Sequence, residues 1–151
     1  MIHQFTLFTS KDEIKLTRAY SSTILSPHQI TTLLRTEKFD CFFVKITSEA
    51  KHILKRYNKS GMLVLVTTSL DENEFLVLEL MDMFILSMSE AIFKKVNFEG
   101  KHMIKDIDRI LMCNFDFVLR LVDAFIVDGK VLVTSVDDIV ERANIQSKIS
   151  F

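Results

Sequence analysis

Two aspartate pairs are the residues whose type and spacing best suit metal binding. Asp106 and Asp108 form one pair, and Asp137 and Asp138 form the other. Carboxylate oxygens are the ligands that magnesium and calcium prefer. Both pairs, however, stand where an apparent helix begins, and the helix dipole stabilises negative charge there. The sequence therefore favours a helix-capping role for both pairs, and we expect neither a metal ion nor a cofactor.

The other metal-binding or redox-active side chains are scattered along the chain. Cys41 and Cys113 lie far apart in apolar stretches and have no CxxC spacing, which predicts buried free thiols in a reducing compartment. The histidines stand singly, outside any HExxH motif, and we expect them to face solvent rather than to bind metal. They are His3, His28, His52 and His102.

The sequence contains no arrangement typical of a catalytic site. Ser10, Ser60 and Ser135 lack a GxSxG nucleophile elbow. The three glycines are isolated, so neither GxGxxG nor GxxxxGK[ST] is present to bind a phosphate. The basic residues between positions 51 and 56 alternate along an expected strand, which is more typical of a solvated sheet edge. We therefore expect a protein without catalytic residues.

Composition narrows the class of protein. The chain has 151 residues, 48% hydrophobic and 26% charged, and a formal net charge of −1. This length predicts one domain, and the apolar share excludes a disordered chain. The near-zero charge disfavours nucleic acid as a partner. The first residues turn polar within ten positions, and no apolar run approaches the ~20 residues of a membrane span, so we expect a cytosolic protein.

The first half of the chain is predicted to form a five-stranded sheet with one inserted helix. Residues 1–21 alternate as a hairpin does. Ser26, Pro27 and Gln29 form a capping-box pattern, which predicts a helix to about Arg35. Three further strands are expected from the β-branched and aromatic runs at residues 39–46, 52–57 and 62–68.

The second half is predicted to be mainly helical. Ser69–Glu72 resembles a capping box before a helix over residues 73–93. Further helices are expected at 103–112 and at 114–127, and Gly129 closes the second of them. A strand is expected at 131–133. A last helix over 137–144 follows it, with Ser135 as its cap. The predicted fold class is α+β, with a mainly antiparallel sheet and C-terminal helices.

The helix at 73–93 carries more apolar surface than one small domain is expected to cover. Its polar strip is narrow and runs through Glu79, Asp82 and Glu90. Exposing several large apolar side chains would cost kilocalories at about 25 cal/mol per Å². The excess therefore favours a subunit of a larger assembly.

Several short motifs, taken in order over residues 1–144, resemble the small sigma chains of clathrin adaptor complexes. The opening hairpin begins with Met-Ile, carries a basic residue and a leucine after the turn, and ends in an aromatic residue. The other matching segments are Ile53–Tyr57, Asp71–Phe75, Asn114-Phe115, Val122-Asp123, Gly129 and Thr134-Ser135.

The sequence also departs from the sigma pattern. Asp123-Ala124 stands where the family usually has an acidic pair, and the segment Val96–Met112 is longer than the corresponding sigma loop. The motifs at 87–89 and 127–129 look like those of the zeta chain of coatomer, a close relative. Met1-Ile2 and Arg56-Tyr57 favour sigma over zeta.

This resemblance implies a longin-like fold in a single domain over residues 1–146, with 147–151 as a frayed tail. It also implies a non-catalytic small subunit of a heterotetrameric vesicle-coat adaptor. Its partners would be a large chain and the other subunits, on coated vesicles, Golgi or plasma membranes. The alternatives are the zeta subunit of coatomer, a free-standing longin-type regulator of a small GTPase or SNARE, and a small enzyme with an unidentified site.

The resemblance also implies two sets of functional residues. Large apolar side chains of the long helix would dock on the large chain, namely Met81, Met83, Phe84 and Met88, with Ile85 beside them. A pocket for acidic dileucine sorting signals would use Met62 and Ile85 as apolar walls and Lys15 as the cation. The alternative is that Met62 and Ile85 are ordinary core residues and that Lys15 is a solvated strand residue.

Overall fold

The computed structural model describes residues 1–9, 13–37, 40–57, 61–91, 107–131 and 135–149. The chain divides into two compact units, Met1–Leu78 and Glu79–Phe151, and the division falls inside a helix. The expectation of a single domain over residues 1–146 stays a prediction.

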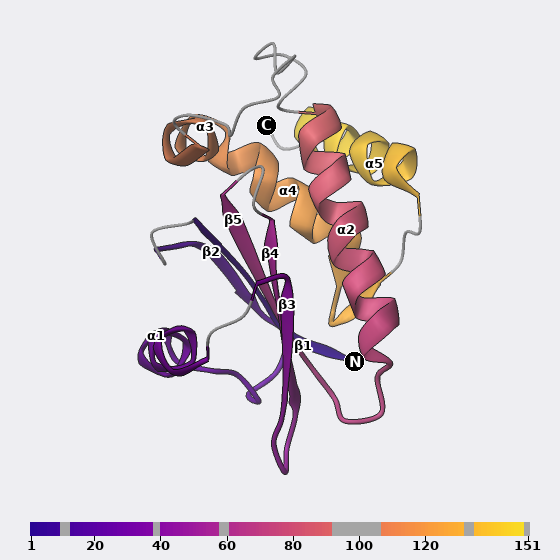
Figure 1. Ribbon diagram of the computed structural model, residues 1–151. Coiled ribbons are helices and arrows are strands. Elements are labelled where there is room, and N and C mark those ends of the chain that lie inside the picture. Colours follow the sequence, from indigo (N-terminus) through magenta and orange to yellow (C-terminus); the bar gives the residue numbers. More distant parts are fainter. Residues whose placement is uncertain (10–12, 38–39, 58–60, 92–106, 132–134, 150–151) are drawn as a thin grey trace. The chain divides into compact units, whose positions relative to one another are not determined.

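The first unit is built on a five-stranded antiparallel sheet with the strand order β2-β1-β5-β4-β3 (Figure 1). Its strands are β1 (Ile2–Thr9), β2 (Ile14–Ala19), β3 (Phe42–Ile46), β4 (Lys51–Tyr57) and β5 (Met62–Thr68). Short connections join β1 to β2 and join β3, β4 and β5 in succession, while β5 pairs with β1 in the middle of the sheet. The predicted α+β class with a five-stranded antiparallel sheet is confirmed.

Strand β5 occupies the centre of this sheet because every one of its side chains can be buried. All seven residues of Met62–Thr68 are buried, so both faces of the strand are covered. The continuous apolar run Met62–Val66 suits that position, since a strand covered on both faces gains nothing from alternating polar residues.

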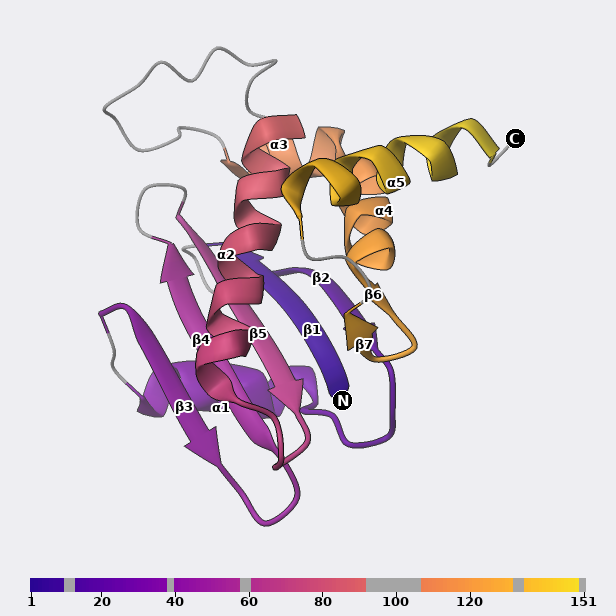
Figure 2. The same ribbon diagram turned by 90° about the vertical axis from the view of Figure 1, so that its right-hand side faces the viewer.

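Helix α1 (Pro27–Thr36) covers one face of the sheet, as Figure 2 shows. The predicted capping box is confirmed. Ser26 Oγ accepts a hydrogen bond from the Gln29 amide at 3.2 Å, and Gln29 Oε1 accepts one from the Ser26 amide at 2.8 Å. The helix contributes Ile30 and Leu33 to a buried cluster whose other members are strand residues, namely Phe8, Leu54, Leu63 and Leu65.

Helix α2 (Glu74–Ala91) begins at a different cap from the predicted one. Asn73 Oδ1 accepts hydrogen bonds from the amides of Phe75, at 2.9 Å, and Leu76, at 3.3 Å. Ser69 instead lies in a turn, where its carbonyl accepts from the Glu72 amide at 3.3 Å. The prediction that Ser69–Glu72 caps the helix was wrong, because asparagine caps a helix as well as serine does. The predicted end of the helix at Phe93 and most of the long loop lie outside the described residues.

The second unit is helical. It contains the rest of α2 with α3 (Ile107–Cys113), α4 (Phe115–Phe125) and α5 (Val136–Ile149). Helix α4 packs against α5, and its Phe125 ring lies 6.0 Å from the ring of Phe84 on α2. Ser135 Oγ accepts from the Asp138 amide at 3.2 Å, which confirms the predicted cap of the last helix. Asp137 and Asp138 lie in the first turn of α5, where the helix dipole stabilises their charge.

A small hairpin follows α4 in place of the predicted helix end. Strands β6 (Ile126–Val127) and β7 (Lys130–Val131) pair through a turn in which Asp128 has φ 52° and Gly129 has φ 77°. The prediction that the helix runs to Val127 and is closed by Gly129 was wrong. An Asp-Gly pair after two β-branched residues favours a two-residue hairpin turn, because both central residues need positive φ.

The last helix is longer than the sequence pattern predicts. Helix α5 reaches Ile149, five residues beyond Asn144, and includes residues 147–149 of the segment expected to be a frayed tail. Residues 150–151 lie outside the described part of the chain, as do residues 132 and 133 of the predicted strand.

The capping box of α1 gives a first test of the fold. Replacing Ser26 with Ala removes the hydroxyl that accepts from the Gln29 amide, and we expect the free energy of unfolding to fall by about 1 kcal/mol. Chemical denaturation followed by circular dichroism measures it. Ser48→Ala, at an exposed turn position, is the matched control and should change stability by less than about 0.5 kcal/mol. Equal stability of the two variants would contradict the assigned cap.

Candidate functional site

Two of the three predicted cargo-binding residues lie at the same end of the sheet. Lys15 lies on β2, where β2 bulges opposite Leu7 and Phe8 of β1. Met62 is the first residue of β5 and pairs with Thr9, the last residue of β1. Strand β1 thus separates them. This placement is compatible with a shared site and does not by itself define one.

The predicted cargo-binding residues are mostly buried, whereas residues that line an open pocket are exposed to solvent. Met62 is fully buried, and Ile85 on α2 is 8% exposed. The Lys15 ammonium lies 2.9 Å from the Glu13 carboxylate, and its side chain is 19% exposed. Lys15 and Met62 belong to the first unit and Ile85 to the second, so the pocket stays a prediction.

The predicted partner-binding residues on α2 are mostly buried. Met81, Phe84 and Met88 are buried, and Met83 is half-buried. The large apolar side chains that α2 exposes are different ones, namely Phe75, Leu76 and Leu86.

A signal in the sequence could have identified the exposed side of α2. Phe75 and Leu86 share one side of the helix with Glu79, Asp82 and Glu90, because the five follow one another at intervals of three or four residues. The polar strip therefore marks the exposed side, and the two apolar residues within it are the ones left uncovered.

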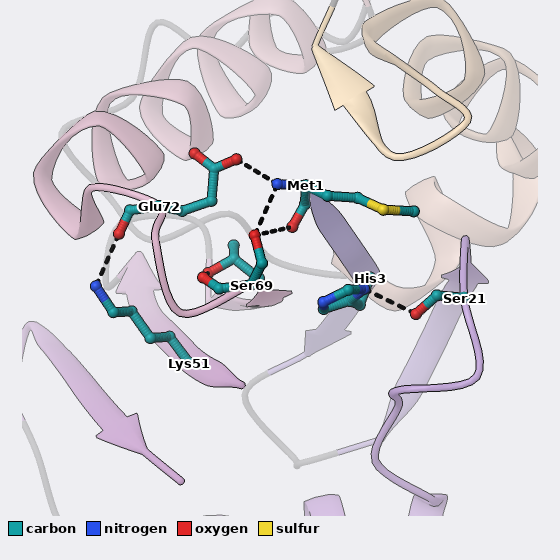
Figure 3. Close-up of polar contacts among 7 residues, drawn as sticks. Met1, His3, Ser21, Lys51, Ser69 and Glu72 are labelled. Carbon is teal, nitrogen blue, oxygen red and sulfur yellow. Dashed lines mark hydrogen bonds and ion pairs between the residues drawn. The ribbon is translucent and has the colours of Figure 1, made fainter. Parts of the chain in front are cut away.

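A network of charged and polar groups fastens the turn before α2 to the sheet (Figure 3). The Lys51 ammonium donates to the Glu72 carbonyl at 2.8 Å. It also donates to the Glu74 carboxylate at 3.2 Å. The Met1 ammonium pairs with the Glu72 carboxylate and donates to Ser69 Oγ at 2.9 Å. Strands β4 and β1 thereby hold the turn from both sides.

Hydrogen bonds in and beside this turn lower the pKa of two carboxyl groups. Hydrogen bonds with its own backbone and with Lys51 hold the pKa of Glu74 below its ordinary value. A hydrogen bond with the Ser69 side chain, followed by one with its own backbone, lowers the pKa of Asp71. Both carboxyl groups therefore stay ionised at neutral pH.

His52 differs from the solvent-facing histidine that the sequence analysis expects. It is 6% exposed, and its Nδ1 lies 2.9 Å from Thr67 Oγ1 on the neighbouring strand. Burial and, to a smaller extent, the nearby charge of Lys45 lower the pKa of His52. The prediction failed because residues 52–54 of β4 are all buried, which the charged residues around them in the sequence do not indicate. His3 is half-buried, and its Nδ1 lies 2.8 Å from Ser21 Oγ (Figure 3).

The cysteines are free, but both are exposed, so the prediction that they are buried was wrong. Cys41 stands just before the edge strand β3, and Cys113 is the last residue of α3. Among the described residues, no three His, Cys, Asp or Glu side chains are placed to hold a metal ion. In the same part of the chain, no helix is both long and apolar enough to span a membrane.

Comparison with known proteins identifies a similar fold. No family model and no curated protein sequence matches this chain. Its structure is similar to a chain in a homology model of the full-length AP-3 complex in a stretched open conformation, with a TM-score of 0.65 and 20% sequence identity. The match covers 99% of this chain and 95% of the other. At this identity the likeness concerns the fold, and it extends over nearly all of both chains.

The buried histidine predicts how stability depends on pH. Because the folded state lowers the pKa of His52, the unfolded chain binds a proton first as the pH falls. We expect its contribution to stability to be complete above about pH 6.5 and to decline below that value until the pH passes the folded pKa.

His52→Gln should flatten this decline, whereas His28→Gln, at an exposed position on α1, should leave it unchanged. Denaturation curves between pH 5 and 8 measure both variants. A decline of the same steepness in the His52 variant would show that another group causes it.

Proposed function

We propose that this chain is a non-catalytic small subunit of a heterotetrameric vesicle-coat adaptor complex, folded as one domain over residues 1–146. The observation that carries the proposal is the similarity of fold, over nearly the full length of both chains, to a chain of the AP-3 complex. The ordered sigma-like motifs support the same class from the sequence. The protein would act on the cytoplasmic side of a membrane, held there through the complex.

Within that class we propose the sigma type. Arg56 and Tyr57, which favour sigma over zeta, lie at the end of β4. Asn73 and Glu74, which belong to the matching segment Asp71–Phe75, stand where α2 begins. Both motifs thus lie where a strand ends or a helix begins. The partners would be a large chain and the other subunits of the complex.

We propose that α2 contributes to contact with the large chain, through Met81, Met83, Phe84 and Met88. The first, third and fourth of these are buried, so substituting them would also disturb the core. Met83 is half-buried, and Leu86, three residues later on the same side of the helix, is 57% exposed. Methionine and leucine at such positions suit a protein interface, because both are large and apolar.

Co-expression with a large adaptor chain tests the proposal. We expect the wild-type chain to co-purify with the large chain, and the double variant Met83→Glu, Leu86→Glu to lose this association, because two charges would enter a desolvated interface. Affinity capture followed by size-exclusion chromatography measures it. The matched control is Arg109→Glu and Arg142→Glu, at two positions in the second unit outside α2, which should leave co-purification intact.

Two outcomes would count against this account. Capture of the large chain by the double variant would place the contact elsewhere on the molecule. A wild-type chain that is a stable monomer and captures no large chain would instead favour the free-standing regulator.

We further propose that Lys15, Met62 and Ile85 take part in binding acidic dileucine signals. Lysine complements the acidic end of such a peptide, and the two apolar residues complement its leucines. In the assembled complex, Lys15→Glu should weaken binding of an acidic dileucine peptide by about tenfold, the equivalent of ~1.4 kcal/mol. Ile85→Ser should also weaken it.

Fluorescence anisotropy with the assembled complex measures peptide binding. The control variant is Lys130→Glu, at an exposed position on β7, and the control peptide has Ala in place of both leucines. If the two peptides bind equally, or if Lys15→Glu and Ile85→Ser bind as the wild type does, the pocket does not bind this class of cargo.

A further inference from the structure

The two edges of the five-stranded sheet differ in character. Strand β2 forms one edge, and its pairing with β1 is interrupted by a bulge near Lys15. A bulge is a device that keeps an edge from pairing with another chain. Strand β3 forms the other edge, and its register with β4 is regular over all five of its residues. Phe42 is 47% exposed and Ile46 is 61% exposed.

The backbone of β3 offers hydrogen-bonding groups at this edge. The Arg56 amide donates to the Cys41 carbonyl at 2.8 Å, and the Thr47 amide donates to the Ala50 carbonyl at 2.9 Å. In an antiparallel pair, hydrogen-bonded residues alternate with residues whose amide and carbonyl point away from the partner strand. Positions 41, 43, 45 and 47 are therefore bonded to β4, so the amides and carbonyls of Phe42, Val44 and Ile46 point to the free edge.

The same three residues also share one face of the sheet. Side chains two residues apart lie on one side of a strand, and Phe43, which alternates with them, belongs to the cluster beneath α1. Phe42, Val44 and Ile46 consequently combine outward backbone groups with apolar side chains on the face away from α1. A strand added to this edge would gain main-chain hydrogen bonds and apolar contacts together.

The charges around β3 indicate which chemistry an added strand should have. The one charged residue of β3 is basic, Lys45, and the ammonium of Lys51 on β4 is already bonded to Glu72 and Glu74. Lys45 is exposed and, within β3, lies on the face opposite to that of Val44. An added strand that alternates apolar and acidic side chains would place its apolar residues beside Phe42 and Ile46, and its acids beside Lys45.

We propose that β3 pairs with an extended segment of another protein in which apolar and acidic residues alternate, and that this segment adds a sixth strand to the sheet. A second copy of this chain fits less well, because a second β3 would bring another Lys45 to the edge and no acid to pair with the first. The proposal concerns the first unit alone and does not depend on the adaptor function.

The test uses the full chain and a fluorescent peptide of sequence Glu-Leu-Glu-Val-Glu-Leu-Glu, with both ends blocked. We expect saturable binding by fluorescence anisotropy. Val44→Pro removes one outward amide while leaving the hydrogen bonds to β4 in place, and should weaken binding about tenfold or more. Val44→Thr keeps the amide and a similar shape, so it is the matched control and should bind within about threefold of the wild type.

Two further arms use the unchanged chain, so that a folding defect in the proline variant cannot decide the result. One peptide is N-methylated on Leu and Val, and another is N-methylated on Glu. Successive amides of a strand point to opposite edges, so each peptide lacks the amide donors of one edge, and one of the two should lose binding. A peptide with Lys in place of Glu should bind at least about tenfold more weakly.

Several results would overturn the proposal. These are absence of binding, equal binding by the proline variant, binding by both N-methylated peptides, and equal binding of the lysine peptide. A wild-type chain that is a dimer in solution, and that Val44→Pro converts to a monomer, would instead identify the occupant of the edge as a second copy.

Discussion

The burial of β5 on both faces is the constraint on which the structure of the first unit depends. A strand with all seven residues buried must have a neighbour along each edge and a cover on each face. Strands β1 and β4 supply the edges, and α1 covers one face through Ile30 and Leu33. The capping box fixes the residue at which α1 begins. The Lys51 network holds the turn that precedes α2 against the sheet.

Those parts of the fold that local chemistry determines could be predicted from the sequence. The strands β1 to β4 follow from alternating patterns, β5 follows from its continuous apolar run, and the start of α1 follows from Ser26 and Gln29. The predicted start of α2 at residue 73 is within one residue of Glu74, but its cap was missed because Ser69 and Asn73 both have side chains that can cap a helix. The hairpin at Asp128 and Gly129 carried a recognisable Asp-Gly signal that a helical pattern obscured.

The candidate functional residues were harder to predict, because function here depends on exposure. Helix α2 is apolar nearly all round, and only its narrow polar strip, which includes Leu86 and leaves out Phe84, indicates that Leu86 is exposed and Phe84 is buried. His52 shows the same difficulty in a strand, since its burial depends on pairing with residues far away in the sequence.

The central claim is that this chain works as one subunit of a heterotetrameric coat adaptor. The most direct measurement is native mass spectrometry of the complex that an affinity-tagged form of the chain captures from its own cells. The account predicts one copy of this chain in a complex with a large chain and two other subunits, at equal stoichiometry. Recovery of the chain as a monomer, or bound only to a small GTPase or a SNARE, would contradict it.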